Sequence, residues 1–167
     1  MAIVYSGRVF SVEVDRKRFP NGQEHEVAVV RHPPSIVLIP VQDDGRVILI
    51  QQYRPSVERV LWELPAGSVD RGEQPDAAAA RECEEEIGLA PRTVKRIRGL
   101  FPTPGFCDEE LIFYRVSDLG RPPADSPHKP DEDEDITPQP FTVAEARAMV
   151  ERGEIVDLKT AYGLTLI

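Results

Sequence analysis

Four glutamates lie close together in the segment Arg81-Glu82-Cys83-Glu84-Glu85-Glu86. On an α-helix, Glu82, Glu85 and Glu86 stand at i, i+3 and i+4 and share one face, with Cβ atoms about 5 to 6 Å apart. Each like-charged pair at ~5 Å costs roughly 0.8 kcal/mol in water and ~3 kcal/mol at an effective dielectric of 20. Mg²⁺ or Mn²⁺ would offset this repulsion and bind phosphate oxygens of a substrate. The alternative is a solvated acidic helix face.

Other side chains have two interpretations each. Arg54 can bind a substrate phosphate through two hydrogen bonds, or form a structural ion pair. Trp62, the one tryptophan, favours core packing over stacking on a base. The three histidines are scattered without the spacing of metal ligands, which disfavours a zinc site.

A helix that positions the glutamates is predicted from Pro75 to Ile87, because proline suits the first helical turn and Gly88 suits the left-handed residue after the last. Two apolar runs, Ser35–Val41 and Arg46–Tyr53, predict core strands that fold back as a hairpin around Gly45.

Further elements follow from alternation, turn residues and capping signals. They are an antiparallel pair over Val9–Val14 and Glu26–Arg31, a short strand near Val60–Leu64, strands over Lys95–Leu100 and Glu110–Val116, a helix capped by Thr142 and Glu145, and a last helix from about Asp157. The stretch Pro122–Pro140 is expected to be irregular for much of its length. Strands joined by short turns indicate an α+β sandwich with a mostly antiparallel or mixed sheet.

Length and composition restrict the class of protein. A chain of 167 residues suits one domain. A net charge of −9 disfavours nucleic acid and anionic membranes as partners. Met1 to Phe10 lack a basic start followed by an apolar run, and no apolar stretch approaches about 18 residues. Because two cysteines also give no disulfide framework, we expect a cytoplasmic protein.

The segment from Gly67 to Leu89 resembles the Nudix box, G-x5-E-x7-R-E-U-x-E-E-x-G-U, at every fixed position. The resemblance implies a Nudix hydrolase: an α/β/α sandwich with a mixed sheet and a loop-helix-loop metal site that cleaves a nucleoside diphosphate joined to another group. It implies that Glu82, Glu85 and Glu86 hold Mg²⁺, with Mn²⁺ as the alternative. It also implies the carbonyl of Ala66 as a further ligand, and an ion pair of Glu73 with Arg81 that braces the loop.

The flanks are similar to the ADP-ribose pyrophosphatase branch. The resembling segments are Gln51-Gln52-Tyr53-Arg54-Pro55, Trp62-Glu63-Leu64-Pro65-Ala66-Gly67, and Pro104-Gly105-Phe106-Cys107-Asp108-Glu109, with Thr103 and Cys107 as mild departures from the third pattern. This resemblance implies hydrolysis of ADP-ribose to AMP and ribose 5-phosphate. We expect Arg54, Pro104, Phe106 and Glu109 to bind substrate, although Glu109 also fits an ordinary surface acid.

The branch also implies a general base on an acidic loop. Asp131-Glu132-Asp133-Glu134-Asp135 occupies that place, and Glu134 and Glu132 are the candidates, against a merely solvated loop. Residues 1–34 resemble the branch's strand extension for homodimer formation, and residues 35–167 its catalytic core. Two alternatives stay open: hydrolysis of another nucleotide sugar such as GDP-mannose, and a non-catalytic nucleotide sensor, which would not need the three glutamates.

Overall fold

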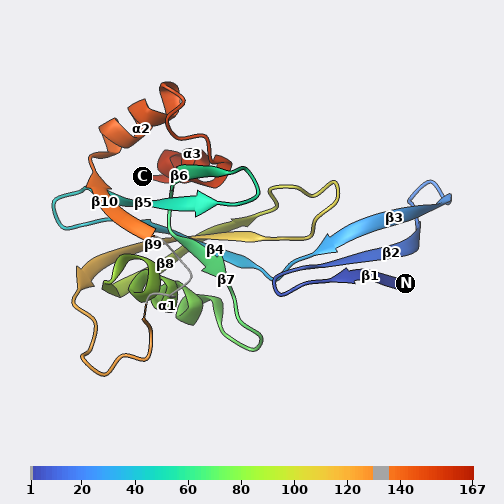
Figure 1. Ribbon diagram of the computed structural model, residues 1–167, viewed down its shortest axis with the longest axis horizontal. Helices are drawn as coiled ribbons and strands as arrows, with labels where there is room; N and C mark the ends of the chain where they lie inside the picture. Colours follow the sequence, from blue (N-terminus) through green and yellow to red (C-terminus); the bar gives the residue numbers. More distant parts are fainter. Residues whose placement is uncertain (1, 130–135) are drawn as a thin grey trace.

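The computed structural model describes residues 2–129 and 136–167, which form three β-sheets and three α-helices (Figure 1). The first sheet is an N-terminal arm with strand order β1-β2-β3, the second has the order β10-β5-β6, and the third β7-β4-β9-β8. The strands are β1 (Ala2–Ser6), β2 (Ser11–Arg18), β3 (Glu24–Arg31), β4 (Ser35–Pro40), β5 (Val47–Arg54), β6 (Arg59–Glu63), β7 (Ala66–Ser68), β8 (Ala90–Leu100), β9 (Leu111–Gly120) and β10 (Ile136–Phe141). The helices are α1 (Pro75–Ile87), α2 (Val143–Glu151) and α3 (Leu158–Gly163), with a 3₁₀ turn at Leu164–Leu166.

The body is the predicted α+β sandwich, with α1 on one side of the sheets and α2 and α3 on the other (Figure 1). Strand β4 is buried along its whole length. Its residues Ile36 and Leu38 pack with α1, whereas Val37 and Ile39 pack with α2 and the C-terminal segment. Because both faces are covered, this strand is a continuous apolar run. It pairs parallel with β9 and antiparallel with β7, so the third sheet is mixed.

The prediction that the two core strands pair as a hairpin is wrong, although the predicted turn between them forms. The turn forms, with Gly45 at φ 81° and the amide of Gln42 donating to the carbonyl of Arg46 at 2.8 Å. However, β4 and β5 belong to different sheets and meet only at a bridge between Val41 and Val47. Strands β7 and β9 already occupy both edges of β4, so β5 cannot pair along it.

The helix ends follow the predicted signals. Helix α1 runs from Pro75 to Ile87, and Gly88 takes the left-handed conformation at φ 68°. Thr142 and Glu145 form a reciprocal capping box at α2, and Asp157 caps α3. No helix in the described part of the chain is long and apolar enough to span a membrane.

Three strands, β1, β7 and β10, were not predicted from the sequence. Strands β1 and β7 are short, and β10 carries Pro138 and Pro140. Proline has no backbone N–H to donate. Because β10 lies at the edge of its sheet, the two prolines are tolerated there. The predicted pair of the arm is confirmed as β2 and β3, in register from Ser11 opposite Arg31 to Arg18 opposite Glu24.

Candidate functional site

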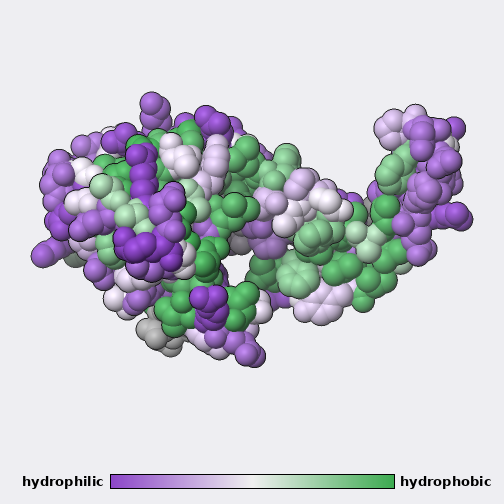
Figure 2. Space-filling model, turned by 90° about the horizontal axis from the view of Figure 1, so that it is seen from above, coloured by the Kyte–Doolittle hydropathy of each residue, from purple (hydrophilic) through white to green (hydrophobic). Residues whose placement is uncertain are grey.

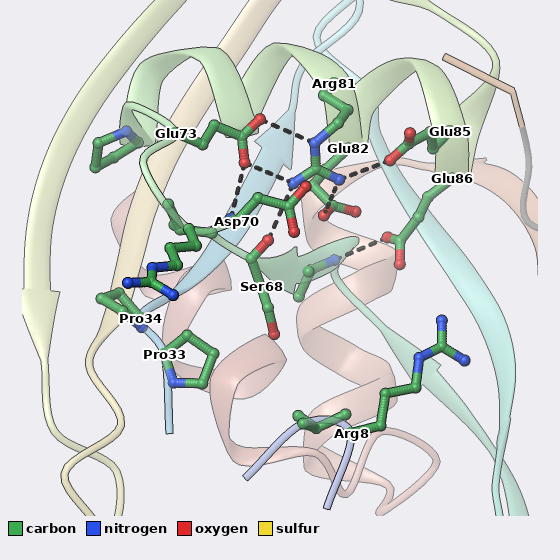
Figure 3. A pocket seen from close by; sticks show the side chains of 16 residues that line it. Arg8, Pro33, Pro34, Ser68, Asp70, Glu73, Arg81, Glu82, Glu85 and Glu86 are labelled. Atoms are coloured by element: carbon green, nitrogen blue, oxygen red, sulfur yellow. Dashed lines mark hydrogen bonds and ion pairs between the residues drawn. The ribbon is translucent and has the colours of Figure 1, made fainter. Parts of the chain in front are cut away.

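A cleft of about 940 Å³ lies between the acidic face of α1, the loop that follows β7, and the turn between β1 and β2 of the arm (Figure 3). Glu82, Glu85 and Glu86 all line it. Five carboxylates and three guanidinium groups belong to the described lining: Asp70, Glu73, Glu82, Glu85, Glu86, Arg8, Arg71 and Arg81. The excess of negative charge favours a cation in this cleft.

Arg81 is the centre of an ion-pair network that connects α1 to the loop. Its Nε and Nη2 donate to the two carboxylate oxygens of Glu73, both at 2.9 Å, and Nη2 also donates to the carbonyl of Ser68 at 3.0 Å. Hydrogen bonds to Glu73 are the main cause of the raised pKa of Arg81, and those same bonds hold the pKa of Glu73 below its usual range. The predicted bracing of the loop by this pair is confirmed.

The same guanidinium contacts two of the predicted metal ligands. Its Nη1 donates to Glu82 Oε1 at 2.7 Å and to Glu85 Oε2 at 2.8 Å. In this arrangement, no three His, Cys, Asp or Glu side chains of the described residues converge as a metal site. Glu82, Glu85 and Glu86 lie on the predicted face of α1. Arg81 neutralises part of their negative charge.

Two of the three carboxylates are held against the strand segment that enters the box. Glu86 is buried, and its Oε2 accepts a hydrogen bond from the backbone amide of Ala66 at 2.8 Å. Glu82 is buried beside Gly67, where an added Cβ would lie 2.0 Å from Glu82 Oε1. Only glycine lets the backbone pass this close to the carboxylate.

The donor set fits a hard divalent cation. It consists of carboxylate oxygens from one helix face, two of them on buried side chains, beside a glycine that leaves room for the Glu82 carboxylate. A buried carboxylate is costly without a compensating positive charge, and the charge of Arg81 is shared among Glu73, Glu82 and Glu85. Glu82, Glu85 and Glu86 are therefore the residues that would hold the cation, with Ala66 beside them.

A second cleft of about 830 Å³ adjoins the first and shares Val9, Ala66, Gly67 and Ser68 with it. Arg54 and Glu109 line this second cleft. Arg54 donates from Nε and Nη2 to the two oxygens of Glu63 at 2.8 and 2.7 Å, so the ion pair considered for Arg54 does form. The pair uses Nε and Nη2 of the guanidinium, and the Arg54 side chain also lines the cleft.

Glu63 is the most buried charged group of this cleft, with 1% of its side chain exposed. Burial acts to raise the pKa of Glu63, but the hydrogen bonds from Arg54 and the charge of Lys159 outweigh burial and lower it. Glu63 is therefore an ionised carboxylate buried between two cations.

Of the remaining residues predicted to bind substrate, Glu109 lines one of the two clefts, whereas Pro104 and Phe106 do not. Glu109 accepts a hydrogen bond from Ser35 Oγ at 2.7 Å and lies 3.6 Å from His32 Nδ1. Pro104 and Phe106 are exposed and line neither cleft of the described residues. The carbonyl of Phe106 instead accepts from the amide of Val30 at 2.7 Å, which fastens the end of the arm to the body.

The structure describes Trp62 and Cys83 but not the candidates for the general base. Trp62 is partly buried and packs against the core, edge-on to Phe141 with ring centroids 5.1 Å apart. Burial raises the pKa of the Cys83 thiol to about 12, in keeping with a passive role. Glu132 and Glu134, the candidates for the general base, lie outside the described residues.

The sequence analysis missed several cationic residues of the clefts, among them Arg8 and Lys159. Arg8 lies in the turn of the arm between β1 and β2 and lines the first cleft (Figure 3). Lys159 on α3 lines the second and contacts Glu63. Neither stands in a recognisable motif, and only the tertiary structure brings them to these positions.

Comparison with known proteins gives a family and a fold. The NUDIX domain family model matches residues 30–159. An ADP-ribose pyrophosphatase of Bacillus subtilis (strain 168) is 33% identical over 161 residues, covering 96% of this chain and 86% of that protein. An ADP-ribose pyrophosphatase of Mycobacterium tuberculosis (strain ATCC 25618 / H37Rv) is 37% identical, covering 98% and 79%.

Similarity extends to proteins with other names. A methanol dehydrogenase activator of Bacillus methanolicus is 32% identical, covering 96% of this chain and 86% of that protein. The crystal structure of an ADP compounds hydrolase superimposes with a TM-score of 0.79 at 22% identity, covering 99% of this chain and 88% of the other. This last likeness shows a shared fold.

Proposed function

The chain belongs to the NUDIX domain family, and on that premise we propose that it is a divalent-metal-dependent pyrophosphatase that hydrolyses ADP-ribose to AMP and ribose 5-phosphate. The observation that carries the proposal is the placement of Glu82, Glu85 and Glu86 on the wall of one cleft. The choice of substrate is supported by two relatives named ADP-ribose pyrophosphatase that match nearly the whole chain.

The residues of the two clefts have separate tasks in this proposal. Glu82, Glu85 and Glu86 hold the cation, Mg²⁺ by preference and Mn²⁺ as the alternative. When bound, the cation neutralises charge on the diphosphate. Arg81 keeps the loop and the acidic face together, and Arg54 and Glu109 bind and orient the substrate in the second cleft.

A general base completes the proposed chemistry, because the attacking water must lose a proton. Glu134 and Glu132 remain our candidates. Separate Glu134→Gln and Glu132→Gln variants, assayed for kcat, identify the base: loss in one variant assigns it, and full activity in both removes the loop from the chemistry.

We also propose a cytoplasmic homodimer in which residues 1–34 serve as the dimerisation element of a catalytic core at residues 35–167. The arm projects from the body, and apolar side chains gather along it (Figure 2). Ile3, Val4 and Tyr5 are each at least half exposed. Exposed apolar clusters of this kind mark interaction surfaces.

The test of the proposed function is a turnover panel with Mg²⁺ and with EDTA. The panel contains ADP-ribose, GDP-mannose, NADH, diadenosine polyphosphate and nucleoside triphosphates. Preference for ADP-ribose that EDTA abolishes is the expected result. Preference for another diphosphate would refute the substrate, and binding without turnover would favour a sensor.

A further inference from the structure

The C-terminal helix supplies a lysine to the second cleft. Lys159 Nζ donates to Glu63 Oε2 and, at 3.0 Å, to Asp157 Oδ2. Its side chain is only 12% exposed, and both partners are carboxylates that also line the cleft. A buried lysine with two anionic partners has a fixed position.

Helix α3 gives this lysine a rigid support. Asp157 Oδ2 accepts from the amide of Thr160 at 2.9 Å and from its hydroxyl at 2.6 Å. The hydroxyl of Thr160, which is fully buried, in turn accepts from the amide of Leu64 at 2.7 Å. Leu64 follows Glu63, so the same helix holds both the backbone and the carboxylate at the end of β6.

Glu63 connects Lys159 to Arg54. Both oxygens of Glu63 accept from Arg54, and Oε2 accepts from Lys159 as well. Lys159 therefore limits the rotation of the carboxylate that fixes the guanidinium plane. The guanidinium must keep that plane to present its outer edge to a diphosphate or sugar oxygen in the cleft.

We propose that Lys159 is a positioning residue that acts through Glu63 to orient Arg54 toward the substrate. The inference rests on the proposed function, in which Arg54 binds the substrate. It assigns a task to the C-terminal helix, which lies outside the Nudix box.

The test is a double-mutant cycle on the full chain, with ADP-ribose and Mg²⁺ as the probe. We expect Lys159→Met to raise KM about tenfold with a smaller change in kcat, because it removes a charge-assisted hydrogen bond near the substrate and leaves the glutamates of α1 intact. In an Arg54→Ala background, the same change should alter KM by less than about twofold, since the orienting effect has lost its target.

Three further variants complete the experiment. Lys159→Arg should restore most of the wild-type KM, and Lys95→Met, on an exposed lysine of β8, is the matched control. Lys159→Gln replaces Lys159→Met if the latter unfolds, as judged by its Tm.

The outcomes separate the inference from the proposed function. Equal effects of Lys159→Met in both backgrounds, or an unchanged KM in the wild-type background, would overturn the positioning role while the proposed function stands. A wild-type protein that neither binds nor turns over ADP-ribose would overturn both.

Discussion

Gly67 shows how one residue without a side chain makes room for the chemistry of another. The backbone at Gly67 passes so close to Glu82 that any Cβ would overlap its carboxylate. Arg81 donates hydrogen bonds to Glu82 itself and to the neighbouring Glu85. At this scale, the site depends on close packing between the strand β7 and the face of α1, as well as on the identity of the glutamates.

Gly67→Ala is therefore predicted to displace the Glu82 carboxylate. We expect kcat/KM to fall at least about tenfold, which corresponds to ~1.4 kcal/mol, and the Mg²⁺ concentration for half-maximal turnover to rise. Gly120→Ala, where no atom lies within 4 Å of the added Cβ, is the control. Wild-type Mg²⁺ dependence in Gly67→Ala would contradict the contact.

The ionised Glu63 predicts a pH dependence of stability. Its pKa is lower in the folded protein than in the unfolded chain, so its contribution is present above the unfolded pKa, near 4.3, and is lost as pH falls through the folded value. The difference in free energy of unfolding between wild type and Glu63→Gln should therefore be largest near neutral pH and shrink below about pH 4.

Denaturant titrations over this pH range measure that difference. Glu151→Gln, on an exposed residue of α2, is the control and should show little dependence. A difference that grows on acidification would mean that the pKa of Glu63 is raised.

At the scale of elements, the segment from β6 to β7 is the part of the chain that connects the two clefts. Glu63 and Leu64 are held by α3, whereas Ala66 bonds to Glu86, and Ser68 bonds to Arg81. Helices on opposite sides of the sandwich thus meet on one short segment, and a change in either can reach the site.

Thr160→Val tests the attachment of α3. The substitution keeps the shape of the side chain but leaves the buried amide of Leu64 without its acceptor, so we expect a loss of about 1–3 kcal/mol in unfolding free energy. Thr165→Val, on an exposed threonine, should change stability by less than about 0.5 kcal/mol. Equal effects of the two substitutions would show that the bond is unimportant.

The elements also show what could be read from the sequence. The bounds of α1 could be predicted because Pro75 and Gly88 fix its ends by local backbone preference. The separation of β4 from β5 could not, because it depends on which strands pair at the edges of β4, and those are distant in sequence. Likewise, the glutamates of α1 followed from spacing, whereas Lys159 meets Glu63 only through the tertiary fold.

At the scale of the whole molecule, the arm would leave its apolar side chains exposed in a monomer. It carries exposed apolar side chains next to the body and places Arg8 at the first cleft (Figures 2 and 3). A second copy of the chain would cover the apolar surface.

Equilibrium sedimentation at micromolar concentration should therefore give a dimer. Tyr5→Glu together with Val4→Glu, which put charges on the apolar surface of β1, should shift the equilibrium toward the monomer. Arg16→Glu, on an exposed charged position of β2, is the control for a changed arm charge. A wild-type monomer would remove the proposed dimer.

The most direct test of the central claim compares ADP-ribose hydrolysis by the wild type and by Glu86→Gln in Mg²⁺, with AMP and ribose 5-phosphate measured as products. The account predicts turnover by the wild type that EDTA abolishes. It also predicts a kcat lowered by about two or more orders of magnitude in a folded Glu86→Gln variant, because a carboxylate ligand has been removed. Near-normal turnover by that variant would contradict the assignment of the acidic face of α1 as the metal site.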